Sequence, residues 1–533
     1  MIKRMKVTLG AVLILFSALA AYVGVLSLGS TAAGVNAAVG SRQKTVRLYT
    51  TRGTIYDRDL APLTNVDSNY HLLIDPHHFE RTDVPYLAKL CGMSVETLIQ
   101  KLDRGTTFTW VCTKRPKSMQ GVYVYEGVRR YTDLAAHLVG YVDGDGRGVA
   151  GLEKCYDRQL RYFGGEKSVT FAADALRNPM AGLGFTITGD DGNYKDGLVT
   201  TLDMEIQRAA QRALSEKTDK GAAVVLDTET GAIRAIASLP TFDPGNIAGE
   251  VAATDGRLVD RALVGQTVGS VFKIVVTVAA IEAGLDGFTY TCHGGIGIGG
   301  RTFTCQKEEA HGHMTLETAF CRSCNVYYIA LGQMLGEKKI VETAKRLGFS
   351  ERQEIADGFY AAAGNLPAAS GSSAQRLANL SIGQGELLAT PLQIARLAAL
   401  CANGGYLLHP TLVKGFYVSG KIEGDRWLRY RERVIEEKTA EKLKAFCIRT
   451  VEEGTGKNAK PSVGGAGGKT ASAQTGVSDA DGKEMLNVYF AGFYPAQKPQ
   501  YAIAVFAENG TSGGATCAPV FREICEQIAA KKH

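Results

Sequence analysis

The feature that most constrains this chain is an uncharged stretch at its N-terminus. Three basic residues lie within the first six positions, and no charged residue then occurs from Val7 to Ser41. The most apolar part, residues 7–29, is long enough to cross a bilayer as one helix of about 20 residues. Basic residues before the segment, and none close after it, place the N-terminus in the cytoplasm. We therefore expect a cytoplasmic tail (1–6), a single transmembrane anchor (7–29) and an extracytoplasmic body.

A cleaved signal peptide is the competing interpretation, because small residues such as Ala32, Ala33, Ala37 and Ala38 follow the apolar segment. The apolar region of a signal peptide is usually only about 7–15 residues long, so we favour an uncleaved anchor. The net charge of +6 is small for 533 residues. It does not favour nucleic acid as a partner, because nucleic-acid-binding proteins usually carry a concentrated basic stripe.

The C-terminal part of the chain has the signals of an α+β fold. Asp203 is placed to cap a helix over TLDMEIQRAAQRAL, and Thr390 with Gln393 forms a capping-box pattern at the start of another. AAVVLD and AIRAIAS are joined by turn residues, as are NVYFAGFYP and YAIAVFAENG. There are too few strand–helix–strand units for a parallel sheet, so we predict helices around an antiparallel sheet.

The first motif with a chemical meaning is VGSVFKIVV, in which Ser270 and Lys273 are three residues apart. On a helix these two side chains share a face. A serine hydroxyl becomes a good nucleophile when a base takes its proton, and a buried lysine can be that base. The pattern alone is weak, because roughly two chance matches are expected in a chain this long. An amphipathic helix with a solvated lysine is the alternative.

Two further motifs follow in the chain. Ser323, Cys324 and Asn325 form an S-x-N sequence, and Lys469 begins the Gly-flanked KTAS sequence, 469–472. The second of these resembles an edge strand against which an extended substrate can lie. S-x-x-K, S-x-N and K-T-x in this order match the motif set of penicillin-recognising serine enzymes.

The chain as a whole resembles the class B penicillin-binding proteins, bitopic peptidoglycan transpeptidases. RGTIYDRD and LAAHLVGYVDGDGRGVAGLEKCYD are similar to signatures of the family's non-catalytic part. LVTTLDMEIQ, VVLDTETGAIRAIASLPTFDPGN and GQGELLATPLQIARLAALCANGG are similar to framework segments of its transpeptidase domain. The resemblance implies an elongated α/β pedestal of the dimerisation type over 42–193. It also implies a transpeptidase domain over 197–533, and this domain would include an all-helical subdomain beside the antiparallel sheet.

The resemblance also implies catalytic roles. Ser270 would attack the penultimate carbonyl of a stem peptide ending in D-Ala-D-Ala, with Lys273 as the base. Ser323 would relay a proton to the leaving amine, and Asn325 would bind the substrate amide. Lys469 would supply positive potential and help to keep Lys273 neutral.

The rest of the implied site lies on the KTAS segment. Thr470 and Ser472 would hold the terminal carboxylate, and the backbone N–H groups of Ser270 and Ser472 would form the oxyanion hole. The family usually has K-T-G, so Ala471 adds a methyl group where substrate and backbone approach each other. We expect from this a modest loss of acylation or a shifted inhibitor spectrum.

The partners that the resemblance implies are stem peptides, β-lactams that acylate Ser270, the membrane and a SEDS-type glycosyltransferase. The motifs leave open a D,D-carboxypeptidase or β-lactamase-like hydrolase, a penicillin sensor, and an inactive scaffold. Elongation, division and sporulation are equally compatible with them, as are diaminopimelate and lysine as acceptor amines.

The chain has eleven cysteines, an odd number that forbids full pairing. Cys292, Cys305, His311 and Cys324 have the spacing C-x12-C-x5-H-x12-C. The elongation-type penicillin-binding protein 2 binds zinc in this region through two carboxylates, a histidine and the cysteine of S-x-N. The resemblance therefore implies a structural zinc site in which Cys292 and Cys305 replace the carboxylates. A Cys292–Cys305 disulfide and reduced, buried thiols are the alternatives. We expect His313 to be exposed and the other cysteines to be buried.

Overall fold

The computed structural model describes residues 2–29, 43–173, 185–305, 310–368, 373–424, 431–478, 482 and 484–531. Contacts divide the chain into two compact units. The first comprises residues 1–52, 67–129 and 164–194, and the second comprises 53–66, 130–163 and 195–533. The compact units therefore differ from the expected linear division near residue 195. Two stretches expected in the pedestal, 53–66 and 130–163, fold with the C-terminal unit.

The first unit begins with the apolar helix α1 (Ile2–Gly29). Its segment Arg4–Val25 has a mean hydropathy of 2.2, and none of its most apolar window is buried in the protein. Apolar side chains such as Ile14, Leu15 and Phe16 are exposed all round the helix. Such a helix is stable when lipid surrounds it, so α1 is consistent with the predicted single-pass anchor.

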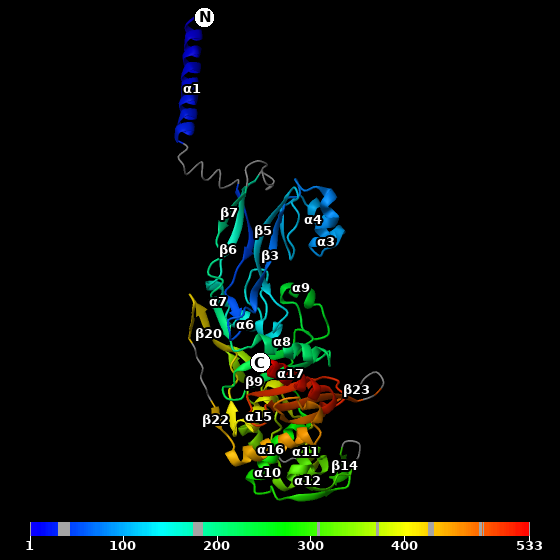
Figure 1. Cartoon of the computed structure of the whole chain (residues 1–533). Helices are drawn as coiled ribbons and strands as arrows, with labels where there is room; N and C mark the ends of the chain where they lie inside the picture. The colour runs from blue at the N-terminus through cyan, green and yellow to red at the C-terminus, as the bar shows by residue number, and fades with distance from the viewer. Residues whose placement is uncertain are drawn as a thin grey trace. The chain divides into compact units, whose positions relative to one another are not determined.

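Two antiparallel sheets and a helical pair make up the rest of the first unit (Figure 1). One sheet has the order β1 (Gln43–Thr50), β6 (Glu166–Ala172), β7 (Phe185–Gly189). The other has the order β4 (Phe108–Cys112), β3 (Thr64–Ile74), β5 (Val122–Tyr131). Next to it lie η1 (Arg81–Asp83), α3 (Val84–Leu90) and α4 (Val95–Asp103). Leu72, Leu87 and Leu98 are fully buried in the core that joins these helices to the sheet.

The second unit is built on a five-stranded antiparallel sheet of order β10-β9-β25-β24-β23. The strands are β9 (Gly221–Asp227), β10 (Ile233–Leu239), β23 (Gly467–Ser478), β24 (Glu484–Tyr494) and β25 (Tyr501–Ala507). Successive side chains along a strand pack into different hydrophobic cores, one on each face of the sheet. Val224 belongs to one core and Val225 to the other. The sheet is therefore covered on both faces, which explains why its strands are apolar almost throughout.

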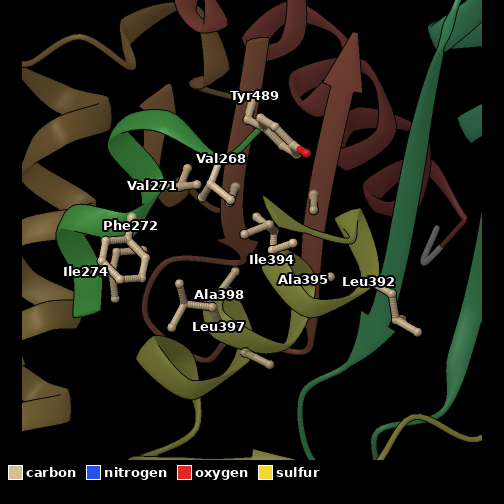
Figure 2. Packing of buried hydrophobic residues seen from close by; sticks show 14 of the residues in the cluster. Val268, Val271, Phe272, Ile274, Leu392, Ile394, Ala395, Leu397, Ala398 and Tyr489 are labelled. Carbon is tan, nitrogen blue, oxygen red and sulfur yellow. The ribbon is translucent and has the colours of Figure 1, made fainter. Parts of the chain in front are cut away.

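Helices α8 (Met204–Ser215) and α17 (Ala518–Ala530) cover one face of this sheet. On the other face lie α10 (Lys273–Glu282) and α15 (Pro391–Ala402). Figure 2 shows Val268, Val271 and Phe272, just before α10, packed close to α15 and to Tyr489 of β24. Asp203 caps α8 and Thr390 forms the capping box of α15, as predicted. The predicted α+β fold on an antiparallel sheet is confirmed.

The remaining strands of the second unit form small sheets. A four-stranded one has the order β2 (Thr54–Tyr56), β8 (Gly197–Thr200), β20 (Val413–Val418), β21 (Lys421–Glu423). The two-stranded pairs are β11 (Gln266–Thr267) with β18 (Leu388–Ala389), β12 (Thr289–Cys292) with β15 (Gly312–Thr315), β13 (Gly295–Ile298) with β14 (Arg301–Thr304), β16 (Gln353–Ala356) with β17 (Phe359–Ala361), and β19 (Tyr406–Leu408) with β22 (Arg431–Arg433).

Short and long helices complete the second unit. They are α5 (Ala136–Val139), α6 (Gly151–Cys155), α7 (Asp157–Tyr162), η2 (Pro244–Asn246), α9 (Ile247–Glu250), η3 (Gly269–Phe272), α11 (Leu316–Arg322), α12 (Asn325–Leu335), α13 (Glu337–Arg346), α14 (Ala374–Ser381), α16 (Glu437–Glu452), η5 (Lys457–Ala459) and η6 (Gly513–Cys517).

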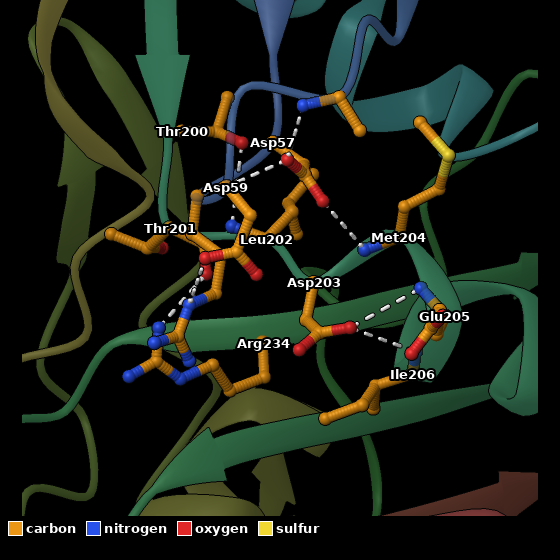
Figure 3. Close-up of polar contacts among 12 residues, drawn as sticks. Asp57, Asp59, Thr200, Thr201, Leu202, Asp203, Met204, Glu205, Ile206 and Arg234 are labelled. Atoms are coloured by element: carbon orange, nitrogen blue, oxygen red, sulfur yellow. Dashed lines mark hydrogen bonds and ion pairs between the residues drawn. The ribbon is translucent and has the colours of Figure 1, made fainter. Parts of the chain in front are cut away.

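The Asp57 carboxylate connects the segment RGTIYDRD to the start of α8 by a hydrogen bond (Figure 3). Asp57 accepts hydrogen bonds from the backbone N–H groups of Asp59 and Ala61 at 2.9 and 2.8 Å, and from that of Met204 at 3.2 Å. Buried N–H groups need such partners, because leaving one unpaired costs roughly 1–3 kcal/mol. Together with the pairing of β2 with β8, this contact holds residues 53–66 in the second unit.

Candidate active site

Ser270 lies in a tight turn that faces the edge strand β23. Gly269 before it has φ +65°, and a Cβ at Gly269 would lie 3.1 Å from both the Ser472 carbonyl oxygen and the Ala473 Cβ. Glycine therefore allows η3 to approach the KTAS strand closely. Ser270 lies in a 3-10 turn, and the α-helix begins at Lys273. Ser270 itself is half-buried.

Lys273 is fully buried and hydrogen-bonded to the S-x-N loop. Its Nζ donates to the Ser323 carbonyl at 2.8 Å, to the Ser323 Oγ at 3.3 Å and to the Asn325 Oδ1 at 2.7 Å. Burial disfavours the ammonium form and lowers the pKa of Lys273 to about 8. A solvated lysine on an amphipathic helix, the alternative interpretation, is excluded by this burial.

The S-x-N loop is the junction of two helices. Helix α11 ends at Arg322 and α12 begins at Asn325. Ser323 between them has φ 57° and ψ 38°, a left-handed conformation that is unfavourable for a residue with a side chain. This conformation turns the Ser323 hydroxyl toward the two lysines, while the Cys324 thiol lies among other thiols. Asn325 is anchored at its other end, where its Nδ2 donates to the Thr304 carbonyl at 3.1 Å.

Lys469 approaches the same serine from β23. It is fully buried, and its Nζ donates to the Ser323 Oγ at 2.9 Å and to the Thr470 carbonyl at 3.1 Å. Burial, with the neighbouring Lys273 as a second cause, holds the pKa of Lys469 well below its usual range. Two ammonium groups on one hydroxyl disfavour double protonation, so the pair favours a neutral amine at this place. Lys273, Ser323, Asn325 and Lys469 are called the catalytic cluster below.

The residues after Lys469 lie on a sheet edge, as the sequence predicted, because β23 is the last strand of the five. The Thr470 Oγ1 is 2.6 Å from the Thr455 Oγ1, and the Ser472 Oγ accepts from the Gly513 N–H at 3.4 Å. Ala471 is only 2% exposed, and its side chain belongs to the core beside Tyr489. The expectation that its methyl group meets the substrate is therefore wrong, because alternation along the strand directs this side chain into the core.

Three thiols and one imidazole meet behind the S-x-N loop. Cys292 and Cys305 have their sulfurs 3.7 Å apart, Cys305 and Cys324 are also 3.7 Å apart, and the Cys292 Sγ is 3.6 Å from the His311 Nδ1. The four ligand atoms all lie within 4.8 Å of one another. These four residues are called the thiol cluster. All cysteines of the chain are free.

The spacing within the thiol cluster fits a tetrahedral zinc ion. Thiolate sulfurs about 2.3 Å from such an ion lie about 3.8 Å apart, and a sulfur and an imidazole nitrogen about 3.5 Å apart. The hydrogen bond between Cys324 and Cys305 lowers the pKa of Cys305 and raises that of Cys324, so the pair gives up a first proton more readily than an isolated thiol. A thiolate is the form that binds a metal.

The predicted exposure of His313 and the predicted burial of the cysteines outside the thiol cluster hold for most of these residues. His313 is exposed, as expected. Cys321 is buried and its thiol donates to the Phe446 carbonyl at 3.7 Å, which is a packing role. Burial also holds for Cys112, Cys401, Cys447, Cys517 and Cys525, whereas Cys91 and Cys155 are partly exposed.

Two contacts of the site were not predicted. Thr455 bonds to Thr470, and the Thr304 carbonyl binds Asn325. The glycines on both sides of Thr455 were a signal for a tight turn, but no local pattern shows which distant strand that turn meets. The Thr304 contact uses a backbone atom, for which the side-chain sequence contains no signal at all.

Two family models match the chain. Residues 221–526 match the penicillin-binding protein transpeptidase domain, and residues 47–180 match the penicillin-binding protein dimerisation domain.

Curated relatives cover most of the chain. Stage V sporulation protein D of Bacillus subtilis is 29% identical over 89% of this chain and 77% of its own length. Penicillin-binding protein PbpB of Mycolicibacterium smegmatis is 30% identical over 81% of this chain and 71% of its own. Peptidoglycan D,D-transpeptidase MrdA of Acinetobacter baumannii is 27% identical over 75% of this chain and 66% of its own.

Solved structures have the same fold. A D,D-transpeptidase domain from Eggerthella lenta superposes with a TM-score of 0.65 at 24% identity, covering 90% of this chain and 99% of that one. Penicillin-binding protein 3 of Mycobacterium tuberculosis in complex with aztreonam has a TM-score of 0.64 at 24% identity and covers 92% of this chain and 97% of its own. Since the transpeptidase model alone spans more than half of the chain and the dimerisation model precedes it, the chain belongs to the class B penicillin-binding proteins.

Proposed function

We propose that this protein is a membrane-anchored peptidoglycan D,D-transpeptidase that cross-links stem peptides through an acyl-enzyme on Ser270. The family membership and the transpeptidase names of relatives such as MrdA support the reaction class. The observation that carries the serine mechanism is the catalytic cluster. Two buried lysines donate to one hydroxyl, that of Ser323, and the turn that carries Ser270 approaches the edge strand β23 closely at Gly269.

Acylation begins with proton transfer. Neutral Lys273 takes the proton of the Ser270 hydroxyl, and the Oγ forms a bond to the penultimate carbonyl carbon of the donor peptide. The carbonyl oxygen becomes an oxyanion that the backbone N–H groups of Ser270 and Ser472 stabilise, each by about 3–4 kcal/mol in analogous sites. The closeness of Gly269 to the Ser472 carbonyl supports this pairing of the two segments.

The tetrahedral intermediate then loses the terminal D-Ala. The proton on Lys273 passes through the Ser323 hydroxyl to the leaving amine as the carbon–nitrogen bond breaks. Lys469, bonded to the same hydroxyl, keeps Ser323 oriented and opposes protonation of Lys273. Asn325 holds the amide of the substrate, with its own amide group fixed by Lys273 and the Thr304 carbonyl.

Deacylation repeats these steps with a different nucleophile. An amine of a neighbouring stem peptide attacks the ester carbonyl, a new amide bond forms, and the Ser270 Oγ leaves with a proton. β-Lactams would acylate the same hydroxyl, consistent with the aztreonam and ampicillin complexes of a structural neighbour. The substrate would lie along β23, whose edge position leaves its backbone groups available.

We also propose that Cys292, Cys305, His311 and Cys324 hold a structural zinc ion. The separations in the cluster and the burial of its thiols support this donor set over a disulfide. When bound, the ion would supply a rigid link between the β13–β14 hairpin and the start of α12. Cys305 follows Thr304 and Cys324 precedes Asn325, so the link would fix the contact between Thr304 and Asn325.

The N-terminus is proposed to lie in the cytoplasm and the second unit outside the membrane, because Lys3, Arg4 and Lys6 lie at the N-terminal end of α1, before its apolar part. A SEDS-type glycosyltransferase in the membrane is the proposed partner that supplies glycan strands. Affinity capture through the N-terminal region, with a variant whose α1 is replaced by an unrelated transmembrane helix, tests this partner.

Labelling with a fluorescent penicillin tests the enzyme assignment. We expect covalent labelling of the wild type and none of Ser270→Ala with an unchanged melting temperature. Equal labelling of the two proteins would refute a serine acyl-enzyme at this position. A donor peptide offered with a competing amine then separates transpeptidation from hydrolysis, since a carboxypeptidase would release mostly the hydrolysed product.

A further inference from the structure

The hydroxyl proposed to bind the substrate carboxylate has a second hydroxyl bound to it. Thr470 is 7% exposed, and its Oγ1 is 2.6 Å from the Oγ1 of Thr455. Among the residues that the structure describes, Thr455 is the hydrogen-bond partner of the Thr470 hydroxyl. Thr455 follows α16, is itself exposed, and has no role in the mechanism above.

Thr455 is held in place by contacts on both sides that do not depend on its hydroxyl. Its backbone N–H donates to the Cys321 carbonyl at 3.2 Å, next to the S-x-N loop. On the other side, a Cβ on Gly514 would lie 2.9 Å from the Thr455 carbonyl oxygen, closer than real Cβ contacts. Asn458 donates to the Gly514 carbonyl at 2.9 Å. The backbone of Thr455 is therefore held from both sides, and the bond to Thr470 is the contact that orients its hydroxyl.

The direction of the bond between the two hydroxyls decides what Thr470 can do. A hydroxyl has one hydrogen and two lone pairs. If Thr470 donated to Thr455, its lone pairs would face the anionic carboxylate and repel it. If Thr455 donates, the single hydrogen of Thr470 is free to point into the cleft.

We propose that Thr455 is a positioning residue that donates to Thr470 and so directs the Thr470 hydrogen toward the terminal carboxylate of the donor peptide or the carboxylate of a β-lactam. This inference rests on the proposed function and adds a determinant of its specificity for free-acid substrates. Thr455 touches no reacting atom, so its contribution concerns binding of the carboxylate and not proton transfer at Ser270.

A pair of ligands that differ only at the carboxylate tests the inference: benzylpenicillin and its methyl ester. For Thr455→Val, which keeps the side-chain shape, we expect kcat/KM of acylation by the free acid to fall about three- to tenfold, because the Thr470 hydroxyl remains but loses the donor that orients its hydrogen. For the methyl ester we expect less than a twofold fall. The loss should lie in the binding constant and not in the maximal acylation rate, because the carboxylate is held before and during the reaction.

Thr455→Ser is the matched control, since it keeps the hydroxyl, and it should restore the wild-type ratio between acid and ester. An equal fall for both ligands, or no fall for the acid, would overturn the inference. Failure of the proposed function is recognised separately, because wild-type protein would then show no Ser270-dependent acylation by either ligand.

Discussion

The catalytic cluster and the thiol cluster meet at consecutive residues, Ser323 and Cys324, but they are held together in different ways. Members of the catalytic cluster bind one another through nitrogen–oxygen hydrogen bonds of 2.7 to 3.3 Å. In the thiol cluster the contacts Cys292–Cys305, Cys305–Cys324 and Cys292–His311 are 3.6 to 3.7 Å long, and S–H groups are weak donors and acceptors. Hydrogen bonds within the protein are therefore enough to hold the first cluster together. The second cluster is held only by weak contacts among its thiols and imidazole, whose arrangement suits a metal ion.

One loop therefore carries a residue of the catalytic cluster, Ser323, next to a residue of the thiol cluster, Cys324, which has a structural role. The left-handed conformation of Ser323 directs its hydroxyl to one side and the next residue's thiol to the other. Changes on the catalytic side should stop the reaction in an intact fold, and changes on the thiol side should act through the position of Asn325.

The largest effect is expected for Ser323→Ala. Removing the hydroxyl that both lysines bind should lower the acylation rate by about 100- to 10,000-fold, the range for loss of general acid–base catalysis. The melting temperature should change little, because Ser323 is only half-buried. Fluorescent-penicillin kinetics and thermal unfolding measure the two quantities, and Ser215→Ala, at an exposed serine on α8, is the control outside the cluster. An active Ser323→Ala enzyme would remove Ser323 from the mechanism.

The second prediction concerns pH. Since burial lowers the pKa of Lys273 to about 8, the neutral base is the minor form below that value and the major form above it. Acylation should rise with pH about tenfold per unit up to about pH 8 and then level off, a difference of about 100-fold between pH 6 and the plateau. Stopped-flow acylation at several pH values measures the profile, with melting temperatures at each pH as the control. A rate that falls as pH rises from 6 to 8 would mean that Lys273 acts in its protonated form.

The third prediction tests the thiol cluster. Wild-type protein should contain about one zinc per chain by elemental analysis, and Cys305→Ser should lose it. Acylation should then fall about tenfold, because a shift of the catalytic loop by even a fraction of an ångström misplaces the reacting groups. Cys155→Ser is the matched control, being a partly exposed cysteine of the same unit outside the cluster. A zinc-free wild-type enzyme with full activity would end the zinc proposal.

The smallest effect on catalysis is expected for Ala471→Gly. The methyl group is in the core, so acylation should change less than about twofold. The free energy of unfolding should fall by about 1–2 kcal/mol, from the lost methyl group and the greater freedom of glycine in a strand. Chemical denaturation measures the second quantity. A large gain in the acylation rate without loss of stability would mean that the Ala471 methyl group faces the substrate and not the core.

Several features could be predicted from the sequence because they depend on local pattern. The caps at Asp203 and Thr390, the hairpin of β9 and β10, and the apolar anchor all follow from residues within a few positions of one another. The compact units could not be predicted in this way. Residues 53–66 join the second unit through the pairing of β2 with β8 and the bond from Met204 to Asp57, which are contacts between segments far apart in the chain.

Residue type and spacing already specify which chemical groups are available: an apolar helix, a serine with a lysine three residues later, and thiols with ligand spacing. How those groups act depends on the folded arrangement. It buried both lysines, which lowers their pKa values, and it faced the Ala471 methyl group inward. It also set Ser323 and Cys324 on opposite sides of one loop. The physical reason is that burial and direction depend on contacts between distant segments, whereas residue type and spacing are properties of the chain alone.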